Sequence, residues 1–89
     1  MTKRDIMLVN EWGLHARPAF ALAKTALRFK SDIWMEKDGV SANIKLVTDI
    51  LSLAAAKGDT LALKAEGEDE KEAAEEIAAL VAGMFGEEK

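Results

Sequence analysis

The chain has 89 residues, 49% of them hydrophobic, which is enough for one modest core, so we expect a single domain over residues 1–89. It has no cysteine and one histidine, which excludes a disulfide framework, a cysteine zinc site and a multi-histidine metal site, so we expect no metal or cofactor and a cytoplasmic setting. The net charge of −4 disfavours nucleic acid as a partner, and no apolar run approaches the roughly 18 residues of a membrane span.

Residues 3–9 are predicted to form the first strand. Ile6 and Leu8 would lie on one face, with Met7 and Val9 on the other. Because both faces carry apolar side chains, the pattern favours a strand in the centre of its sheet.

The stretch Gly-Leu-His-Ala-Arg-Pro at residues 13–18 places the only histidine at the start of a helix. Proline is tolerated only in the first helical turn, so Pro18 implies that the helix begins near His15, and Gly13 permits a sharp turn before it. The helix should extend to Phe29. Its buried face is predicted from apolar residues at spacings of three and four: Ala19, Leu22, Ala23, Ala26 and Phe29.

His15 is thus expected at or beside the N-cap of this helix. The backbone amides of the first turn, including that of Ala16, and the positive end of the helix dipole would form an anion site beside the imidazole, which Arg17 could reach as a forked donor. The alternative is a capping or merely exposed histidine. A cap is better made by Ser, Thr, Asp or Asn, and Arg17 in the first turn opposes the dipole. The pattern therefore favours a phosphorylated histidine.

A second stripe on the same helix combines cations with large apolar side chains. It is either a solvated edge or a docking surface. Trp12, beside the motif, is either packed on the core or exposed to a partner. The stripe consists of Arg17, Phe20, Lys24, Leu27 and Arg28.

A hairpin and a second helix are predicted next. Residues 31–37 alternate as a strand, Asp38-Gly39 is a hairpin signal, and Val40–Asn43 forms the return strand. A helix over about Ile44–Ala56 has two apolar stripes, which favours either core filling or an exposed patch beside the motif.

The last elements are a strand at Thr60–Glu66 and a third helix. Asp69 with Glu72 resembles a capping box, and the buried face continues through Ile77 and Met84. The acidic residues of its first turns are expected to be a solvated face that complements the helix dipole. The predicted fold class is α+β: an open-faced β-sandwich with a four-stranded antiparallel sheet covered on one face by three helices, in the order βαββαβα.

Residues 13–19, Gly-Leu-His-Ala-Arg-Pro-Ala, resemble the active-site motif of the HPr family, the histidine phosphocarriers of the bacterial phosphotransferase system. Ser52-Leu53, Ala56-Lys57-Gly58 and residues 65–71 are also similar to family segments at matching positions. The resemblance implies the same open-faced sandwich. It also implies that His15 accepts a phosphoryl group on Nδ1 from phosphorylated enzyme I and passes it to an enzyme IIA-type acceptor, while Arg17 compensates the phosphate charge.

A phosphocarrier of this kind is not an enzyme by itself, because its turnover depends on the active sites of its partners. We expect a monomer. The alternative is an HPr-like regulatory binding module of the nitrogen-related or transcription-regulating branch, which acts mainly by protein–protein contact. By resemblance, the partner surface consists of Trp12, Phe20, Lys24, Leu27, Val47, Thr48 and Leu51.

Two features of the second helix set this chain apart from many family members. Leu46 occupies the position of a regulatory serine, which excludes control by an HPr kinase at that residue. Asp49 is expected to face the acidic rim of standard sugar-branch acceptors, and the like charge would slow their association. With Thr48, it would thereby tune the choice of partner.

Overall fold

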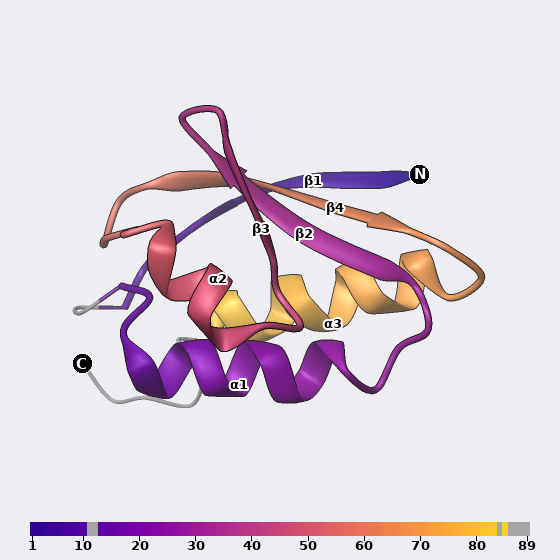
Figure 1. The fold of residues 1–89 in the computed structure, drawn as a ribbon. Coiled ribbons are helices and arrows are strands. Elements are labelled where there is room, and N and C mark those ends of the chain that lie inside the picture. The colour runs from indigo at the N-terminus through magenta and orange to yellow at the C-terminus, as the bar shows by residue number, and fades with distance from the viewer. Residues whose placement is uncertain (11–12, 84, 86–89) are drawn as a thin grey trace.

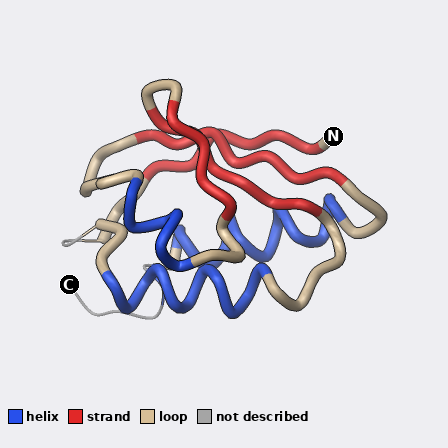
Figure 2. Tube along the Cα trace, in the orientation of Figure 1, coloured by secondary structure: helices blue, strands red, loops and turns tan. Residues whose placement is uncertain are grey.

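The computed structural model describes residues 1–10, 13–83 and 85. The elements are β1 (Thr2–Met7), α1 (Ala16–Ala26), β2 (Asp32–Lys37), β3 (Val40–Asn43), α2 (Val47–Ser52), β4 (Thr60–Glu66) and α3 (Glu70–Ala82). The four strands form one antiparallel sheet in the order β1-β4-β2-β3. Figures 1 and 2 show all three helices on the same side of this sheet, and none of the described elements covers its other face. The predicted fold class is confirmed.

The core lies between the sheet and the helices, and the alternation of the strands creates it. Leu61, Leu63 and Ala65 of β4 are completely buried. In the sheet register Ile6 lies opposite Leu61, and Met35 lies opposite Leu63. These inward side chains pack against the helices and bury apolar surface, which is the main source of stability for so small a fold.

The prediction that the first strand is central was wrong. β1 lies at the edge of the sheet, next to β4. Met7 and Val9, which suggested a second buried face, are 53% and 40% exposed, whereas Ile6 and Leu8 are buried as predicted. Apolar residues on both faces therefore did not indicate burial on both faces in this strand.

Four residues of the predicted buried face of the first helix are buried: Ala19, Leu22, Ala23 and Ala26. The predicted extension to Phe29 was wrong, because the helix ends at Ala26, and Phe29 packs against the core from outside it as a partly buried residue. The second helix is much shorter than predicted, covering Val47–Ser52 instead of residues 44–56. Leu53 is its C-cap, and the next residue, Ala54, has a φ of 50°, a left-handed conformation that cannot continue a helix.

The third helix has Asp69 at its N-cap, but the predicted capping box is absent. The Asp69 side chain makes no capping hydrogen bond, because its carboxylate accepts the backbone N–H groups of Lys30 and Ser31 from the loop after α1. In a capping box a glutamate side chain bonds back to a backbone N–H before the helix. Here Glu70 makes a bond of this kind, because its Oε1 accepts the Gly67 N–H at 3.3 Å. Met84 lies outside the described residues. In the described part of the chain, no helix has the length and apolar character that crossing a membrane requires.

Candidate functional site

His15 is the N-cap residue of α1. Its backbone is extended, with φ −84° and ψ −172°, its carbonyl accepts the Ala19 N–H at 3.0 Å, and its side chain makes no capping hydrogen bond. Helix geometry leaves the N–H groups of Ala16 and Arg17 without an intrahelical acceptor, and Pro18 has none to satisfy. The partly exposed imidazole therefore stands at a helix end suited to an anion.

The loop before His15 is fixed by close backbone contacts. The Leu14 N–H donates to the Ala55 carbonyl at 3.0 Å, and the Gly13 carbonyl accepts Nδ2 of Asn10 at 2.8 Å. Gly13 has a φ of +62°, and a Cβ at this residue would lie 2.4 Å from the Ala55 oxygen. Only glycine fits this approach. His15 is thus held by the helix on one side and by the Ala55 backbone on the other.

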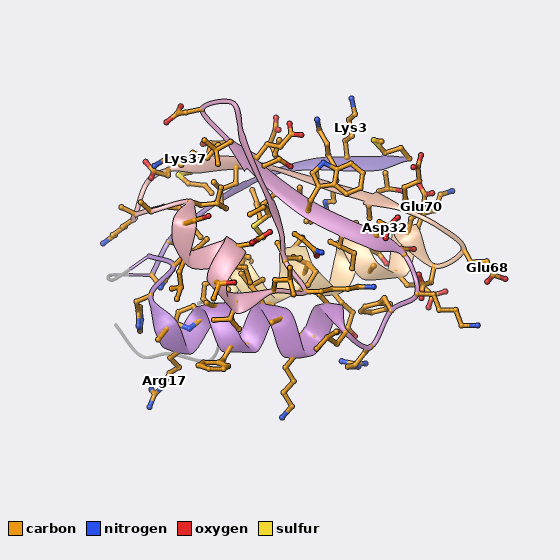
Figure 3. All side chains as sticks on the ribbon, viewed as in Figure 1. Lys3, Arg17, Asp32, Lys37, Glu68 and Glu70 are labelled. Carbon is orange, nitrogen blue, oxygen red and sulfur yellow. The ribbon has the colours of Figure 1, made fainter. Side chains whose placement is uncertain are left out.

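Arg17 lies in the first turn of α1 and is exposed. Figure 3 shows its side chain extending from the start of the helix away from the sheet. The first turn of α1 contains no acidic residue, so the charge of Arg17 is not offset there. Arg17 lies at the same end of the helix as His15, so its guanidinium could stabilise an anion bound there by charge-assisted hydrogen bonds.

The predicted partner surface contains large apolar side chains in solvent. Phe20, Leu27 and Leu51 are 64%, 65% and 41% exposed, and α1 packs beside α2. Lys24 and Thr48 are also exposed.

Two of the predicted surface residues differ. Val47 is partly buried and packs against the core, and Trp12 lies outside the described residues. Leu46 is a surface residue that the predicted partner surface did not include. It is 50% exposed at the N-cap of α2, and the second apolar stripe of the helix was the signal that could have placed it there.

Asp49 does not lie as expected. It is partly buried, and its Oδ2 accepts the Asn43 N–H at 3.3 Å. With Trp34 and Lys45 it lines a hollow of about 370 Å³ beside β2 and β3. Because the carboxylate accepts this hydrogen bond and faces the sheet side of α2, the structure does not support the expectation that it repels an acidic partner.

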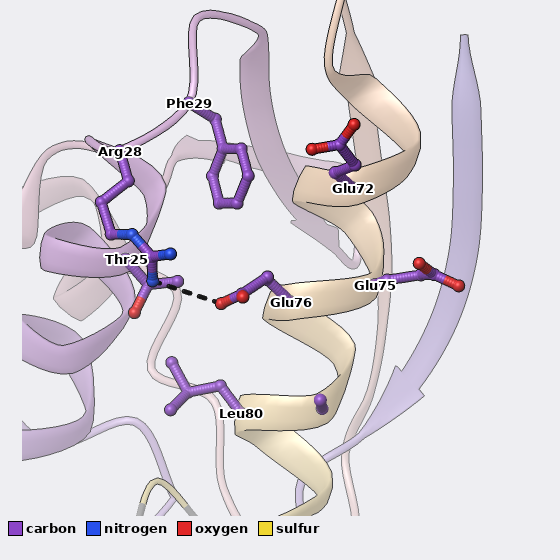
Figure 4. A pocket seen from close by; sticks show the side chains of 8 residues that line it. Thr25, Arg28, Phe29, Glu72, Glu75, Glu76 and Leu80 are labelled. Atoms are coloured by element: carbon purple, nitrogen blue, oxygen red, sulfur yellow. Dashed lines mark hydrogen bonds and ion pairs between the residues drawn. The ribbon is translucent and has the colours of Figure 1, made fainter.

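A larger groove of about 670 Å³ lies between α1 and α3 (Figure 4). The guanidinium of Arg28 pairs with Glu76 at 3.3 Å and lies 5.7 Å from the ring centre of Phe29. His15 does not line this groove. Among the residues that the structure describes, no group of three or more His, Cys, Asp and Glu side chains could hold a metal ion.

The open-faced sandwich with a histidine at the N-terminus of α1 is the arrangement that the resemblance to histidine phosphocarriers implies. A family model described as "PTS HPr component phosphorylation site" matches residues 2–83. The chain belongs to this HPr family of the phosphotransferase system, so the family resemblance of the sequence is confirmed.

Similar proteins cover the chain almost completely. The phosphocarrier protein HPr of Neisseria meningitidis is 40% identical over 87 residues, 98% of each chain. The crystal structure of HPr-C-His from Thermoanaerobacter tengcongensis has a TM-score of 0.96 at 43% identity and covers 100% of both chains. The Bacillus subtilis catabolite repression protein Crh, solved as a dimer with a swapping domain, has a TM-score of 0.76 at 40% identity, covering 94% of this chain and 97% of that one.

Proposed function

We propose that this HPr-family protein accepts a phosphoryl group on Nδ1 of His15 from phosphorylated enzyme I and passes it to an enzyme IIA-type acceptor. The observation that carries the proposal is the position of His15, whose partly exposed ring stands at the N-cap of α1 without capping the helix. A nucleophile thus lies beside amides that would receive the phosphate oxygens.

In the transfer, the lone pair of a neutral imidazole attacks phosphorus while the bond between phosphorus and enzyme I breaks. The ring proton stays on Nε2 during the attack. The backbone N–H groups of Ala16 and Arg17 would donate hydrogen bonds to the phosphate oxygens, and the guanidinium of Arg17 would compensate their charge. The reverse chemistry delivers the group to the acceptor, so the protein completes a turnover only with its partners.

A reconstituted relay tests this function. The protein, enzyme I, phosphoenolpyruvate and a panel of IIA proteins are combined, and phosphate on each component is measured. We expect label on this protein and on at least one IIA protein, and neither when His15→Ala replaces the wild type. Transfer through the His15→Ala protein would refute the proposal.

A regulatory binding module is the second candidate, and the likeness to Crh favours it. This role would use the same exposed apolar residues of α1 and α2 without needing phosphate. The presence of His15 supports the carrier instead. The module would be favoured by two results together: His15→Ala binds a regulator as well as the wild type does, and the wild type passes no label to any IIA protein.

We infer a cytoplasmic location, where phosphoenolpyruvate and enzyme I act. The monomer remains our prediction. Because the Crh structure is a dimer, sedimentation velocity of the unphosphorylated protein is the appropriate check, and a concentration-dependent dimer would overturn it.

A further inference from the structure

The backbone that holds the His15 loop is itself held by two side chains from elsewhere. Oδ2 of Asp59 accepts the Ala56 N–H at 2.8 Å, and Nζ of Lys37 lies 3.2 Å from the same oxygen. Nζ of Lys37 also donates to the Ala54 carbonyl at 3.3 Å. These bonds bracket Ala55, whose carbonyl receives the Leu14 N–H at 3.0 Å. Lys37, at the end of β2 (Figure 3), thereby reaches the connection between α2 and β4.

We propose that Lys37 and Asp59 are positioning residues that hold the Ala54–Ala56 backbone as the platform on which Leu14, and through it His15, is placed. This inference rests on the proposed function of His15. Both side chains bond to the Ala54–Ala56 segment. Their effect passes through one backbone hydrogen bond, from Leu14 to Ala55.

The conformation of Ala54 explains why the platform needs a clamp. Its φ of 50° is unfavourable for a residue with a Cβ. Such a conformation persists only where surrounding contacts fix it, and the bond from Lys37 to the Ala54 carbonyl is a contact of this kind. Without it, the segment can relax toward an ordinary backbone conformation, and the Ala55 carbonyl would move with it.

The other side of the segment is already anchored. The Leu8 N–H donates to the Asp59 carbonyl at 3.0 Å, and the Gly58 N–H donates to the Leu8 carbonyl at 2.8 Å. Relaxation would therefore be concentrated between Ala54 and Ala56, directly beneath Gly13 and Leu14. The Ala56 amide and Lys37 also hold the pKa of the Asp59 carboxyl below its usual value, so the clamp is charged at neutral pH.

The consequence for phosphotransfer is geometric. In-line attack requires the imidazole nitrogen to face the phosphorus at close range, and small misplacements reduce the rate strongly. A looser platform should lower the maximal rate of phosphate transfer from enzyme I. The concentration of enzyme I that gives half of this rate should stay nearly unchanged, because the exposed docking residues are not altered.

The test compares Lys37→Ala with Lys64→Ala. Lys64 pairs with Glu36 at 2.7 Å, and the side-chain exposures of that pair, 22% and 34%, equal those of Lys37 and Asp59. Both variants lose an ion pair of similar burial, but Lys64 lies within the sheet, opposite Lys3 and Trp34, and its partner is Glu36 of β2. We expect Lys37→Ala to transfer phosphate roughly 3- to 10-fold more slowly, to exchange its Leu14 amide hydrogen roughly tenfold faster, and to shift the His15 ring signals in NMR spectra. Lys64→Ala should match the wild type in all three.

Lys37→Arg keeps a donor at this position and should recover most of the rate. If Lys37→Ala fails to fold, Asp59→Asn removes the charge at nearly constant size and should give the same changes in weaker form. A folded Lys37→Ala protein with wild-type transfer and wild-type Leu14 exchange would overturn the proposal, as would equal losses in Lys64→Ala. If the wild type takes no phosphate on His15, the proposed function fails, while Leu14 exchange and the ring signals still test the clamp.

Discussion

Ser31 Oγ donates a 2.5 Å hydrogen bond to Oδ1 of Asp69, which ties the loop after α1 to the start of α3. The same carboxylate accepts the Ser31 and Lys30 N–H groups, both at 2.9 Å. The Ser31 hydroxyl above all, and then the Lys30 amide, lower the pKa of Asp69 to about 2 from its ordinary 3.8. These bonds are stronger to the ionised carboxylate than to the neutral carboxyl group, so they favour the charged form.

This pKa predicts an acid-dependent loss of stability. The folded pKa of Asp69 lies below the unfolded value, so its stabilisation is fully present above about pH 4 and is lost as the pH falls toward about 2. We expect Asp69→Asn to lower Tm by several degrees at pH 7, and the difference from the wild type to shrink through this window. Glu68→Gln, which removes an exposed carboxylate from the same loop, is the control. A difference in Tm that is independent of pH would contradict the assignment.

Replacing Gly13 tests the close approach beneath the His15 loop. Gly13→Ala places a Cβ 2.4 Å from the Ala55 oxygen at a φ of +62°, so we expect a loss of about 3 kcal/mol in the free energy of unfolding by urea titration. Gly39→Ala is the matched control, because Gly39 has a φ of +80° and a Cβ added there would have nothing within 4 Å. It should lose only the conformational part, about 1 kcal/mol. Equal losses of unfolding free energy in the two variants would mean that the loop rearranges to accommodate the added methyl group.

Arg17→Ala should separate transfer from folding. The residue is exposed, so its removal should leave Tm within about a degree of the wild type, since a cation in the first turn opposes the helix dipole only weakly at the surface. Transfer from enzyme I should slow roughly tenfold, less than for a buried oxyanion donor, because water competes at an exposed site. Arg28→Ala, which removes an exposed cation from the turn after α1, is the control. A wild-type rate would remove Arg17 from the site.

Phe20→Ser tests the docking surface. At 64% exposure the ring contributes little to folding, but its burial against enzyme I would make it an anchor of the interface. We expect the half-saturating concentration for enzyme I to rise roughly tenfold with little change in maximal rate. Met7→Ser removes an apolar side chain of 53% exposure from β1 and should change neither quantity. Identical kinetics for both variants would exclude Phe20 from the surface.

The sequence predicted the elements with simple local signals. Pro18 and the glycine before it correctly indicated the start of α1, and regular alternation gave the observed bounds of β3 and β4. Errors arose where tertiary contacts override local pattern. The early end of α2 depends on a left-handed conformation at Ala54, where the sequence has no glycine to indicate it. The carboxylate of Asp69 does not cap its own helix, because it accepts hydrogen bonds from a loop 38 residues away in sequence.

The site shows the same division. The N-cap position of His15 could be predicted because neighbouring residues determine it. The Lys37–Asp59 clamp could not, since it joins residues 22 positions apart that only the folded sheet brings together. Asp49 was misplaced for a related reason, as its partner is the Asn43 amide and no helical spacing reveals a contact with the preceding strand.

The most direct test of the account is to locate the phosphoryl group. The protein is incubated with enzyme I and phosphoenolpyruvate, and the product is studied by ³¹P and ¹⁵N NMR and by mass spectrometry under neutral or basic conditions. We predict one phosphoryl group, on Nδ1 of His15, stable to base and labile to acid as a phosphoramidate is. A phosphoryl group on any other residue, or none on the folded protein in the presence of active enzyme I, would contradict the central claim.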